Sequence, residues 1–182
     1  MALQKLPLEK AFMLVEPGPV LLVTTNDGRK NNIMTITWHM VMDFTPQIAL
    51  TTGPWNHSFQ ALRDTKECVL AVPTVDLAEK AVAIGDCSGA DVDKFRGFGL
   101  TPLPGLGGKA PLISECLACL ECRVLDYVEP YGIFILRGTQ AWMDLERRER
   151  RTFHANGDGT FRADGETLCL RSLMEDKLPP GV

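Results

Sequence analysis

Small polar and large apolar side chains alternate between Asn31 and Asp43. The apolar positions are Met34, Ile36, Trp38 and Met40, and the polar positions are Thr35, Thr37 and His39. A β-strand places successive side chains on opposite faces, so the pattern predicts one strand with an apolar face and a polar face. Hydroxyls and an imidazole beside large apolar side chains could line a ligand groove. A solvated face on an edge strand explains the same alternation equally well.

A second candidate is the segment that joins the end of a predicted strand to the start of a predicted helix. It contributes Thr51, Thr52, His57 and Ser58. Free N–H groups at a helix start and the helix dipole favour an anion such as a phosphate, and Ser58 is the expected N-cap. A plain N-cap without a ligand is the simpler interpretation of this segment taken alone.

Charged residues add two weaker candidates. Lys94 stands among carboxylates in Asp91–Phe95, where it could form a surface ion pair or supply positive charge to a phosphate or an anionic ring. Arg29 and Lys30 lie in a predicted turn and are as well explained by solvated surface as by phosphate contacts.

Several kinds of site are disfavoured by the sequence. It has neither a G-x-G-x-x-G nor a P-loop motif, and its three histidines lack zinc-hydrolase spacing. The glycine-rich Gly105–Lys109 is interpreted as a turn-rich loop. A net charge of −4 and a pI near 5.4 argue against nucleic-acid binding. No stretch approaches the ~20 apolar residues of a membrane span, so a cytoplasmic protein is expected.

Three cysteines, Cys116, Cys119 and Cys122, are spaced like the start of a ferredoxin motif. The fourth cysteine and its proline are missing, so buried core thiols are the favoured interpretation and a thiol-bound metal the weaker one. On a strand, Cys119 would face away from the other two. In a cytoplasmic protein the six cysteines are expected to be reduced thiols.

The predicted elements contain many strands and few helices. The predicted strands are Val20–Thr25, Ile33–Val41, Gln47–Thr52, Cys68–Val72, Leu117–Tyr127 and Ile133–Met143, and the predicted helices are Ser58–Asp64, Asp76–Ile84 and a short one within Asp91–Phe95. Strict β-α-β alternation is missing, which favours a closed or sandwiched antiparallel sheet with peripheral helices. The 182 residues are expected to form a single domain with a C-terminal extension from about residue 145.

Several short segments occur in an order that is typical of one protein family. They are Pro17–Thr25, Asn32–Trp38, Asn56–Ser58 at a helix start, Ser88–Phe95, Ala110–Ile113 leading to Leu120–Cys122, and a tail with His154–Phe161 and Asp164–Glu166. Together they resemble the flavin-reductase-like FMN-binding family, and within it the flavoredoxin branch, over roughly residues 10–175.

The resemblance implies a mainly β fold: an FMN-binding split β-barrel, Greek-key-like, with peripheral helices. It also implies a homodimer with one FMN per subunit near the interface. The cofactor-binding residues expected from it are Asn32, Met34, Thr35, Thr37, Trp38, His39, Thr51, Thr52, His57, Ser58 and Lys94. No catalytic residue and no metal ligand is predicted, because flavin accepts the hydride itself, although His39 could tune the ring or relay a proton.

Two redox functions are compatible with this resemblance. A flavin reductase would oxidise NADH or NADPH directly, whereas a flavoredoxin-type carrier would take electrons from a protein donor. A split-barrel module that binds another ligand without redox activity is the alternative.

Overall fold

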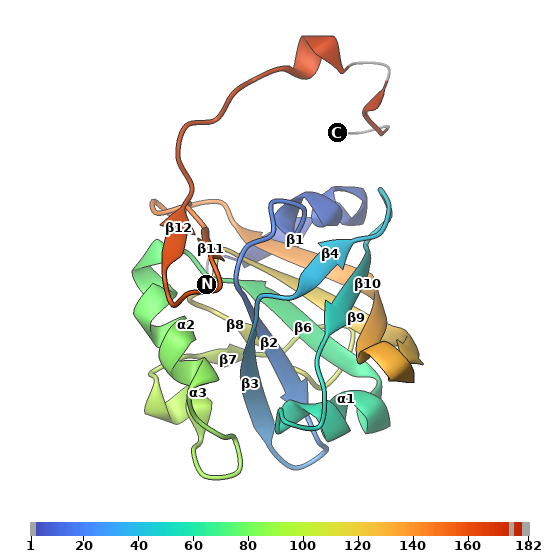
Figure 1. The fold of residues 1–182 in the computed structure, drawn as a ribbon, viewed down its shortest axis with the longest axis vertical. Coiled ribbons are helices and arrows are strands. Elements are labelled where there is room, and N and C mark those ends of the chain that lie inside the picture. The colour runs from blue at the N-terminus through green and yellow to red at the C-terminus, as the bar shows by residue number, and fades with distance from the viewer. Residues whose placement is uncertain (1–2, 175–176, 180–182) are drawn as a thin grey trace.

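An antiparallel sheet of eight strands forms most of the protein, shown by a computed structural model that describes residues 3–174 and 177–179 (Figure 1). The strands follow the order β3-β2-β6-β9-β10-β5-β4, and β1 pairs with the last residues of β10. They are β1 (Leu3–Leu6), β2 (Leu21–Asn26), β3 (Asn31–Ile36), β4 (His39–Val41), β5 (Gln47–Thr51), β6 (Glu67–Val72), β9 (Ala118–Val128) and β10 (Ile133–Asp144). Two separate pairs are β7 (Pro102–Leu103) with β8 (Leu112–Ile113), and β11 (Phe153–Ala155) with β12 (Phe161–Ala163).

The helices of the described residues are short and lie around the sheet. They are α1 (Ser58–Thr65), α2 (Ala78–Gly85) and α3 (Lys94–Gly97), together with the 3-10 turns η1 (Leu8–Leu14), η2 (Val75–Leu77), η3 (Glu129–Tyr131) and η4 (Arg171–Leu173). The chain crosses from one end of the sheet to the other between β3 and β4, and returns between β5 and β6. These crossings give the sheet the predicted Greek-key-like connectivity.

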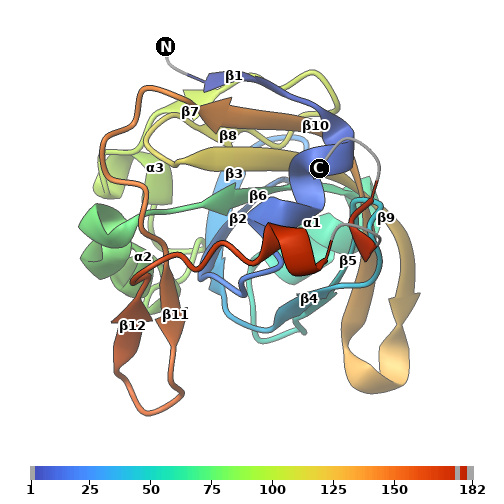
Figure 2. The same ribbon diagram turned by 90° about the horizontal axis from the view of Figure 1, so that it is seen from above.

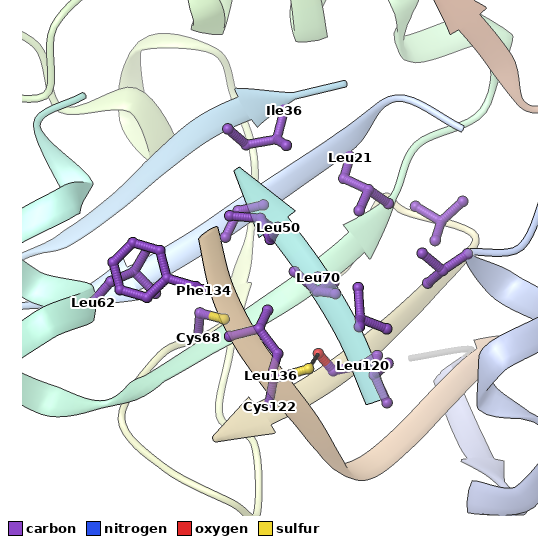
Figure 3. Packing of buried hydrophobic residues seen from close by; sticks show 14 of the residues in the cluster. Leu21, Ile36, Leu50, Leu62, Cys68, Leu70, Leu120, Cys122, Phe134 and Leu136 are labelled. Carbon is purple, nitrogen blue, oxygen red and sulfur yellow. Dashed lines mark hydrogen bonds between the residues drawn. The ribbon is translucent and has the colours of Figure 1, made fainter. Parts of the chain in front are cut away.

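The sheet curls around a buried apolar cluster. Leu21 of β2 and Leu50 of β5 belong to this cluster although three strands lie between β2 and β5 in the sheet (Figure 3). On the opposite face, Leu22 and Val69 pack in a second cluster with residues of α2 and α3. Each fully buried leucine contributes roughly 1.5–3 kcal/mol relative to exposure. The result is a barrel whose two end strands, β3 and β4, do not pair with each other.

The predicted strand Ile33–Val41 is wrong as a single element. β3 ends at Ile36 and pairs with β2, whereas β4 begins at His39 and pairs with β5. The predicted apolar face is divided accordingly: Met34 and Ile36 are buried, but Trp38 and Met40 are exposed. The opposite face is not a polar face either, because Ile33 is fully buried beside α2.

The other predicted strands are confirmed with small shifts in their ends, but two helix starts differ. Ser58 is the first residue of α1, and the flanking His57 makes no side-chain cap. The predicted helix Asp76–Ile84 begins instead as the 3-10 turn η2, and the Asp76 carboxylate accepts hydrogen bonds from Thr74 and Arg147. The short helix predicted within Asp91–Phe95 begins at Lys94.

Candidate functional site

Two hollows lie on either side of the loop that joins β5 to α1. The helix-start cavity, of about 170 Å³, is lined by Thr25, Asp27, Lys30, Asn32, His57, Ser58, Gln60, Ala61 and Asp64. The tryptophan hollow, of about 160 Å³, is lined by Thr35, Ile36, Thr37, Trp38, Thr51, Trp55 and Asn56. Asn32 and Thr35 stand three residues apart on β3, about 10 Å along the strand, and their side chains point to opposite faces of it.

Ser58 is the centre of a buried hydrogen-bond network in the helix-start cavity. Its Oγ accepts hydrogen bonds from Thr25 Oγ1 at 2.9 Å and from Asn32 Nδ2 at 2.9 Å. Both lone pairs of the hydroxyl are thereby used, which leaves its own hydrogen for an acceptor in the cavity. Ser58 also opens α1, where the first N–H groups lack intrahelical acceptors and the helix dipole is positive. This arrangement can hold an anionic or hydroxyl-rich group.

Asn32 lines the same cavity and carries a buried, unsatisfied acceptor. Its Oδ1 is buried and has no hydrogen-bond partner among the described residues. An unpaired buried acceptor costs roughly 1–3 kcal/mol, which a ligand donating a hydrogen bond would recover. The loop behind Asn32 approaches closely, since a Cβ on Gly89 would lie 2.1 Å from Oδ1. Lys30 holds this loop in place by donating from Nζ to Gly89 O at 2.6 Å.

The two carboxylates that line the helix-start cavity already have partners. Asp27 Oδ1 accepts from the backbone N–H groups of Lys30 at 2.7 Å and Arg29 at 2.8 Å. These bonds, that of Lys30 first, hold the pKa of Asp27 below its ordinary value. Asp64 Oδ1 accepts from Gln60 Nε2 at 2.8 Å. Hydrogen bonds do not remove the charge of a carboxylate, so the lining carries two carboxylates beside the one ammonium of Lys30.

Two exposed indole rings flank the tryptophan hollow. Trp38 is 67% exposed and Trp55 is 71% exposed. A Cβ on Gly53 would lie 2.2 Å from the Trp55 ring, so the missing side chain lets this ring lie against the backbone. Thr35 is held from the other side, because its Oγ1 donates to Ala81 O at 2.5 Å. The indole faces offer an apolar surface to a planar aromatic group.

Met34 and Thr52 lie behind these hollows. Met34 packs in the barrel core, and Thr52 is fully buried. Thr52 Oγ1 donates to Met34 Sδ at 3.9 Å and accepts from Asn56 Nδ2 at 2.9 Å. Their side chains therefore position the loop before α1, and only their backbone groups could contact a ligand.

Lys94 is buried and lines neither hollow. Its side chain is 4% exposed, and Nζ donates to Ile84 O at 2.8 Å near the end of α2. Loss of hydration lowers the pKa of Lys94, while the Cys87 thiol nearby acts in the opposite direction. The predicted surface ion pair is therefore wrong: this ammonium complements the C-terminal dipole of a helix that packs on β3.

His39 lies in a third hollow, the methionine groove. This groove, of about 460 Å³, is lined by Val15, Glu16, Gly18, His39, Met40, Val41, Met42, Asp43 and Phe44. His39 Nε2 donates to Pro19 O at 2.6 Å, and Nδ1 is buried with no partner in the part of the chain described. Loss of hydration lowers the pKa of His39, against the opposing effect of the bond to Pro19. The strand break separates His39 from the polar residues of β3.

The cysteines are free and mostly buried. Cys116 and Cys119 pack in the cluster beside α2 and α3, whereas Cys122 packs in the barrel core. Cys119 and Cys122 thus face opposite sides as predicted, but Cys116 does not face with Cys122, because it precedes β9. Burial raises the pKa of Cys119 to about 12 and that of Cys116 and Cys122 well above the ordinary value. No group of three His, Cys, Asp or Glu side chains among the described residues is arranged to hold a metal.

The structure thus brings together most, but not all, of the predicted site. Asn32, His57 and Ser58 share one hollow, and Thr35, Thr37, Trp38 and Thr51 share the other. Sequence reasoning missed Thr25 and Trp55. Thr25 pairs with Asn32 in the predicted hairpin, so the cross-strand register was the signal that could have found it. Trp55 belongs to the segment before α1, but nothing in the sequence indicated that its indole lines a hollow.

An antiparallel barrel left open between β3 and β4, with a polar helix start and exposed indoles nearby, is a split β-barrel with a candidate ligand site. The chain belongs to the flavin reductase like domain family, whose model matches residues 13–161. Among curated relatives, the Escherichia coli uncharacterized protein YddH is 28% identical over 178 residues, which covers 88% of this chain and 94% of that protein. An uncharacterized protein of Archaeoglobus fulgidus is 36% identical over 101 residues, covering 55% of this chain and 57% of that protein.

Solved structures show the same fold. An FMN-binding domain of a flavin reductases-like enzyme from Shewanella baltica superposes with a TM-score of 0.85 at 24% identity, covering 92% of this chain and 96% of that chain. The flavoredoxin of Desulfovibrio vulgaris has a TM-score of 0.77 at 24% identity, covering 84% and 89%. The predicted FMN-binding split-barrel fold is confirmed by these similarities. The described helices include none long and apolar enough to cross a membrane.

Proposed function

We propose that the chain binds FMN and passes hydride or electrons through it, as a flavin reductase or as a flavoredoxin-type carrier. The observation that supports this most is the network at the start of α1. There Ser58 and Asn32, joined by a hydrogen bond, line the same small cavity, and Asn32 Oδ1 is a buried acceptor without a partner among the described residues. A hydrogen-bond donor and an acceptor side by side fit a polyhydroxyl chain that ends in a phosphate.

The two hollows would hold different parts of the cofactor. Lys30, His57 and Ser58 would hold the phosphate and Asn32 the ribityl chain, while Thr35, Thr37 and Thr51 would lie toward the ring. Trp38 and Trp55 would cover part of the ring. Bound FMN would supply the hydride and electron chemistry, and the side chains of this chain would bind it, orient it and exclude water.

We propose that the active form is a cytoplasmic homodimer. Each of the two hollows is smaller than the roughly 300 Å³ at which pockets begin to enclose a small molecule, and both indoles beside the second hollow are exposed. A second copy covering this side would shield the ring from water. The six free cysteines are compatible with a reducing cytoplasm.

Titration of the purified protein with FMN tests the proposal. We expect quenching of FMN fluorescence and a structured visible spectrum, saturating at one FMN per chain. A protein that stays colourless and does not quench FMN would instead be a split-barrel module without this redox function. For the loaded protein, rapid anaerobic bleaching by NADH or NADPH identifies a reductase, and bleaching only by a reduced protein donor identifies a carrier.

A further inference from the structure

Four large apolar side chains are exposed on β4 and its flanking residues. They are Trp38, Met40, Met42 and Phe44, at every second position of the segment that contains β4. β4 is also the last strand in the sheet order. An exposed apolar strand at a sheet edge tends to associate with another chain unless something covers it. These four residues, named the β4 row, therefore need a covering surface.

The C-terminal arm, residues 165–174, leaves the barrel from a firmly held base. Just before the arm, Asp164 Oδ2 accepts from Thr152 N at 2.6 Å and from Thr152 Oγ1 at 2.8 Å. His154 bridges Asp164 to the start of the barrel, with Nε2 2.8 Å from Asp164 Oδ1 and Nδ1 donating to Gly18 O at 3.0 Å. Gly18 lines the methionine groove, so the arm begins beside the groove that the β4 row also lines.

The arm itself is rich in uncovered apolar side chains. Leu168 is 73% exposed and Leu173 is 80% exposed, and Leu170 and Met174 are also exposed. Leu170 and Leu173 are three residues apart, which places them on the same side of the 3-10 turn η4, and Met174 follows directly; these three residues are named the leucine stripe. Figures 1 and 2 together show the arm passing above η1 and β4 without joining the sheet. Terminal segments that need no partner are usually polar, which this arm is not.

We propose that the leucine stripe of one copy packs against the β4 row of a second copy, and that two copies exchange their arms reciprocally. A second copy is the partner that fits, because one chain exposes both halves of the contact and a two-fold dimer uses each half twice. Methionine side chains adapt their shape to an apolar helical stripe, which suits Met40 and Met42 to this role.

The arm exchange has a consequence for the candidate site. Trp38 belongs both to the β4 row and to the tryptophan hollow, so a partner's arm on the row also covers one side of that hollow. This inference specifies the surface of the homodimer proposed above, and it is independent of whether the protein binds FMN.

Disulfide crosslinking of the full-length protein distinguishes exchange between chains from folding back on one chain. Cys169 is exposed in the arm, and Met42 lies in the row, so the variant C87S/M42C is oxidised with copper phenanthroline. We expect a covalent dimer on a non-reducing gel. A disulfide to Cys169 within one chain, or no disulfide at all, would overturn the proposal. Variants C87S, C87S/V82C and C87S/C169S/M42C should give no dimer band.

Sedimentation of charge-bearing variants provides a second test. L170D/L173D places two carboxylates on the leucine stripe, and T167D/S172D adds the same charge to the arm outside it. We expect the dimer dissociation constant to rise roughly ten-thousandfold for the first variant, about tenfold for each of the four leucines no longer buried in the dimer, and to change little for the second. An equal response of both variants would contradict the proposal.

The same variants separate this proposal from the proposed function. FMN titration of each variant is measured beside its sedimentation. A wild-type dimer that crosslinks through its arm but binds no FMN would refute the proposed function and leave arm exchange standing. A wild-type monomer that binds FMN would refute arm exchange and leave the proposed function standing.

Discussion

At the scale of single residues, the candidate site depends on which polar atoms are still unpaired. Thr25 and Asn32 both donate to Ser58 Oγ, so the Ser58 hydrogen and the buried Asn32 Oδ1 are left without a partner among the described residues. The nearby carboxylates of Asp27 and Asp64 are held by other groups of the protein. Lys30 and the start of α1 are the positive groups of the helix-start cavity, beside these two carboxylates.

Replacing Ser58 by alanine tests whether this cavity holds a phosphate. S58A removes one hydrogen bond to a charged group, worth about 1.5–3 kcal/mol, so FMN should bind roughly ten- to a hundredfold more weakly. Riboflavin, which lacks the phosphate, should lose little affinity. Fluorescence quenching measures both ligands, and S114A, far from the cavity, should behave as wild type. Equal losses for FMN and riboflavin would show that Ser58 does not face the phosphate.

His39 should make the folded protein sensitive to mild acid. Because burial lowers its pKa in the folded chain below the ordinary value of about 6.5, the unfolded chain binds the proton more readily. Above pH ~6.5 the contribution of neutral His39 to the free energy of unfolding is fully present. As the pH falls through the lowered folded pKa, the unfolded chain is favoured by proton binding and this contribution is lost.

The variant H39Q isolates this effect, because glutamine can still donate to Pro19 O but does not titrate. We expect the urea midpoint of wild type to fall between pH 7.5 and pH 5, and that of H39Q to fall less. The exposed His57 provides the control, H57Q, which should keep the wild-type pH dependence. Identical pH profiles for wild type and H39Q would rule out His39 as the cause.

At the scale of elements, local alternation predicted strands well but not where one strand stops and the next begins. Met34–Met40 alternates without interruption, yet the chain leaves β2 after Ile36 and pairs with β5 from His39. The strand break depends on which neighbouring strand each half pairs with. The partner of β4 is β5, which comes later in the chain, so the local pattern does not show the break. The same limit explains why Trp38 and Met40 were expected on the face of Met34 but are exposed.

The glycine-rich loop Gly105–Lys109 shows a second limit of local patterns. Its residues predict only a turn, but the loop is bound to two buried carboxylates, Glu67 and Glu121, on the outer side of the sheet. Glu121 accepts hydrogen bonds from Leu106 N at 3.1 Å, from Gly107 N, and from Trp142 Nε1 at 2.7 Å. A Cβ on Gly105 would lie 2.4 Å from the Glu121 carboxylate, so a glycine is needed there for steric reasons.

Neutralising Glu121 should therefore destabilise the fold. In E121Q the amide NH₂ would face backbone and indole N–H donors, leaving buried donors unpaired at a cost of about 3 kcal/mol. Urea unfolding measures the change. Glu115 provides the matched control, because it is bonded to Thr101 N at the surface, and E115Q should cost under about 1 kcal/mol. Similar small losses in both variants would mean that the loop does not depend on the buried carboxylate.

At the scale of the whole molecule, the candidate site joins segments that the sequence presents separately. Asn32 and Ser58 were each predicted as candidates, but nothing local indicates that their side chains meet at 2.9 Å. The family resemblance supplied that connection, since it placed both residues near one cofactor. It could not supply side-chain directions, so Lys94 and His39 were expected at the cofactor although they line neither of the two hollows.

The C-terminal hairpin closes the molecule by returning to the start of the barrel. Val20 N donates to Phe153 O at 2.8 Å, and His154 connects Asp164 to Gly18. Burial alone would raise the pKa of Asp164, but hydrogen bonds from His154 and Thr152 outweigh it and hold the pKa below its ordinary value. The carboxylate therefore stabilises the fold above its unfolded pKa of about 3.9, and this contribution is lost as the pH falls through the lowered folded value.

Replacing Asp164 by asparagine should consequently matter at neutral pH and not in strong acid. We expect D164N to lower the free energy of unfolding by about 1 kcal/mol at pH 7, because the carboxylate is partly exposed and its bonds are screened by solvent. Well below pH ~4, where the wild-type carboxyl is also protonated, the urea midpoints of the two proteins should converge. D158N changes a carboxylate that bonds only within the hairpin turn and should have a smaller effect at pH 7. A D164N deficit of the same size at both pH values would mean that the hairpin is held by shape and not by the charge of Asp164.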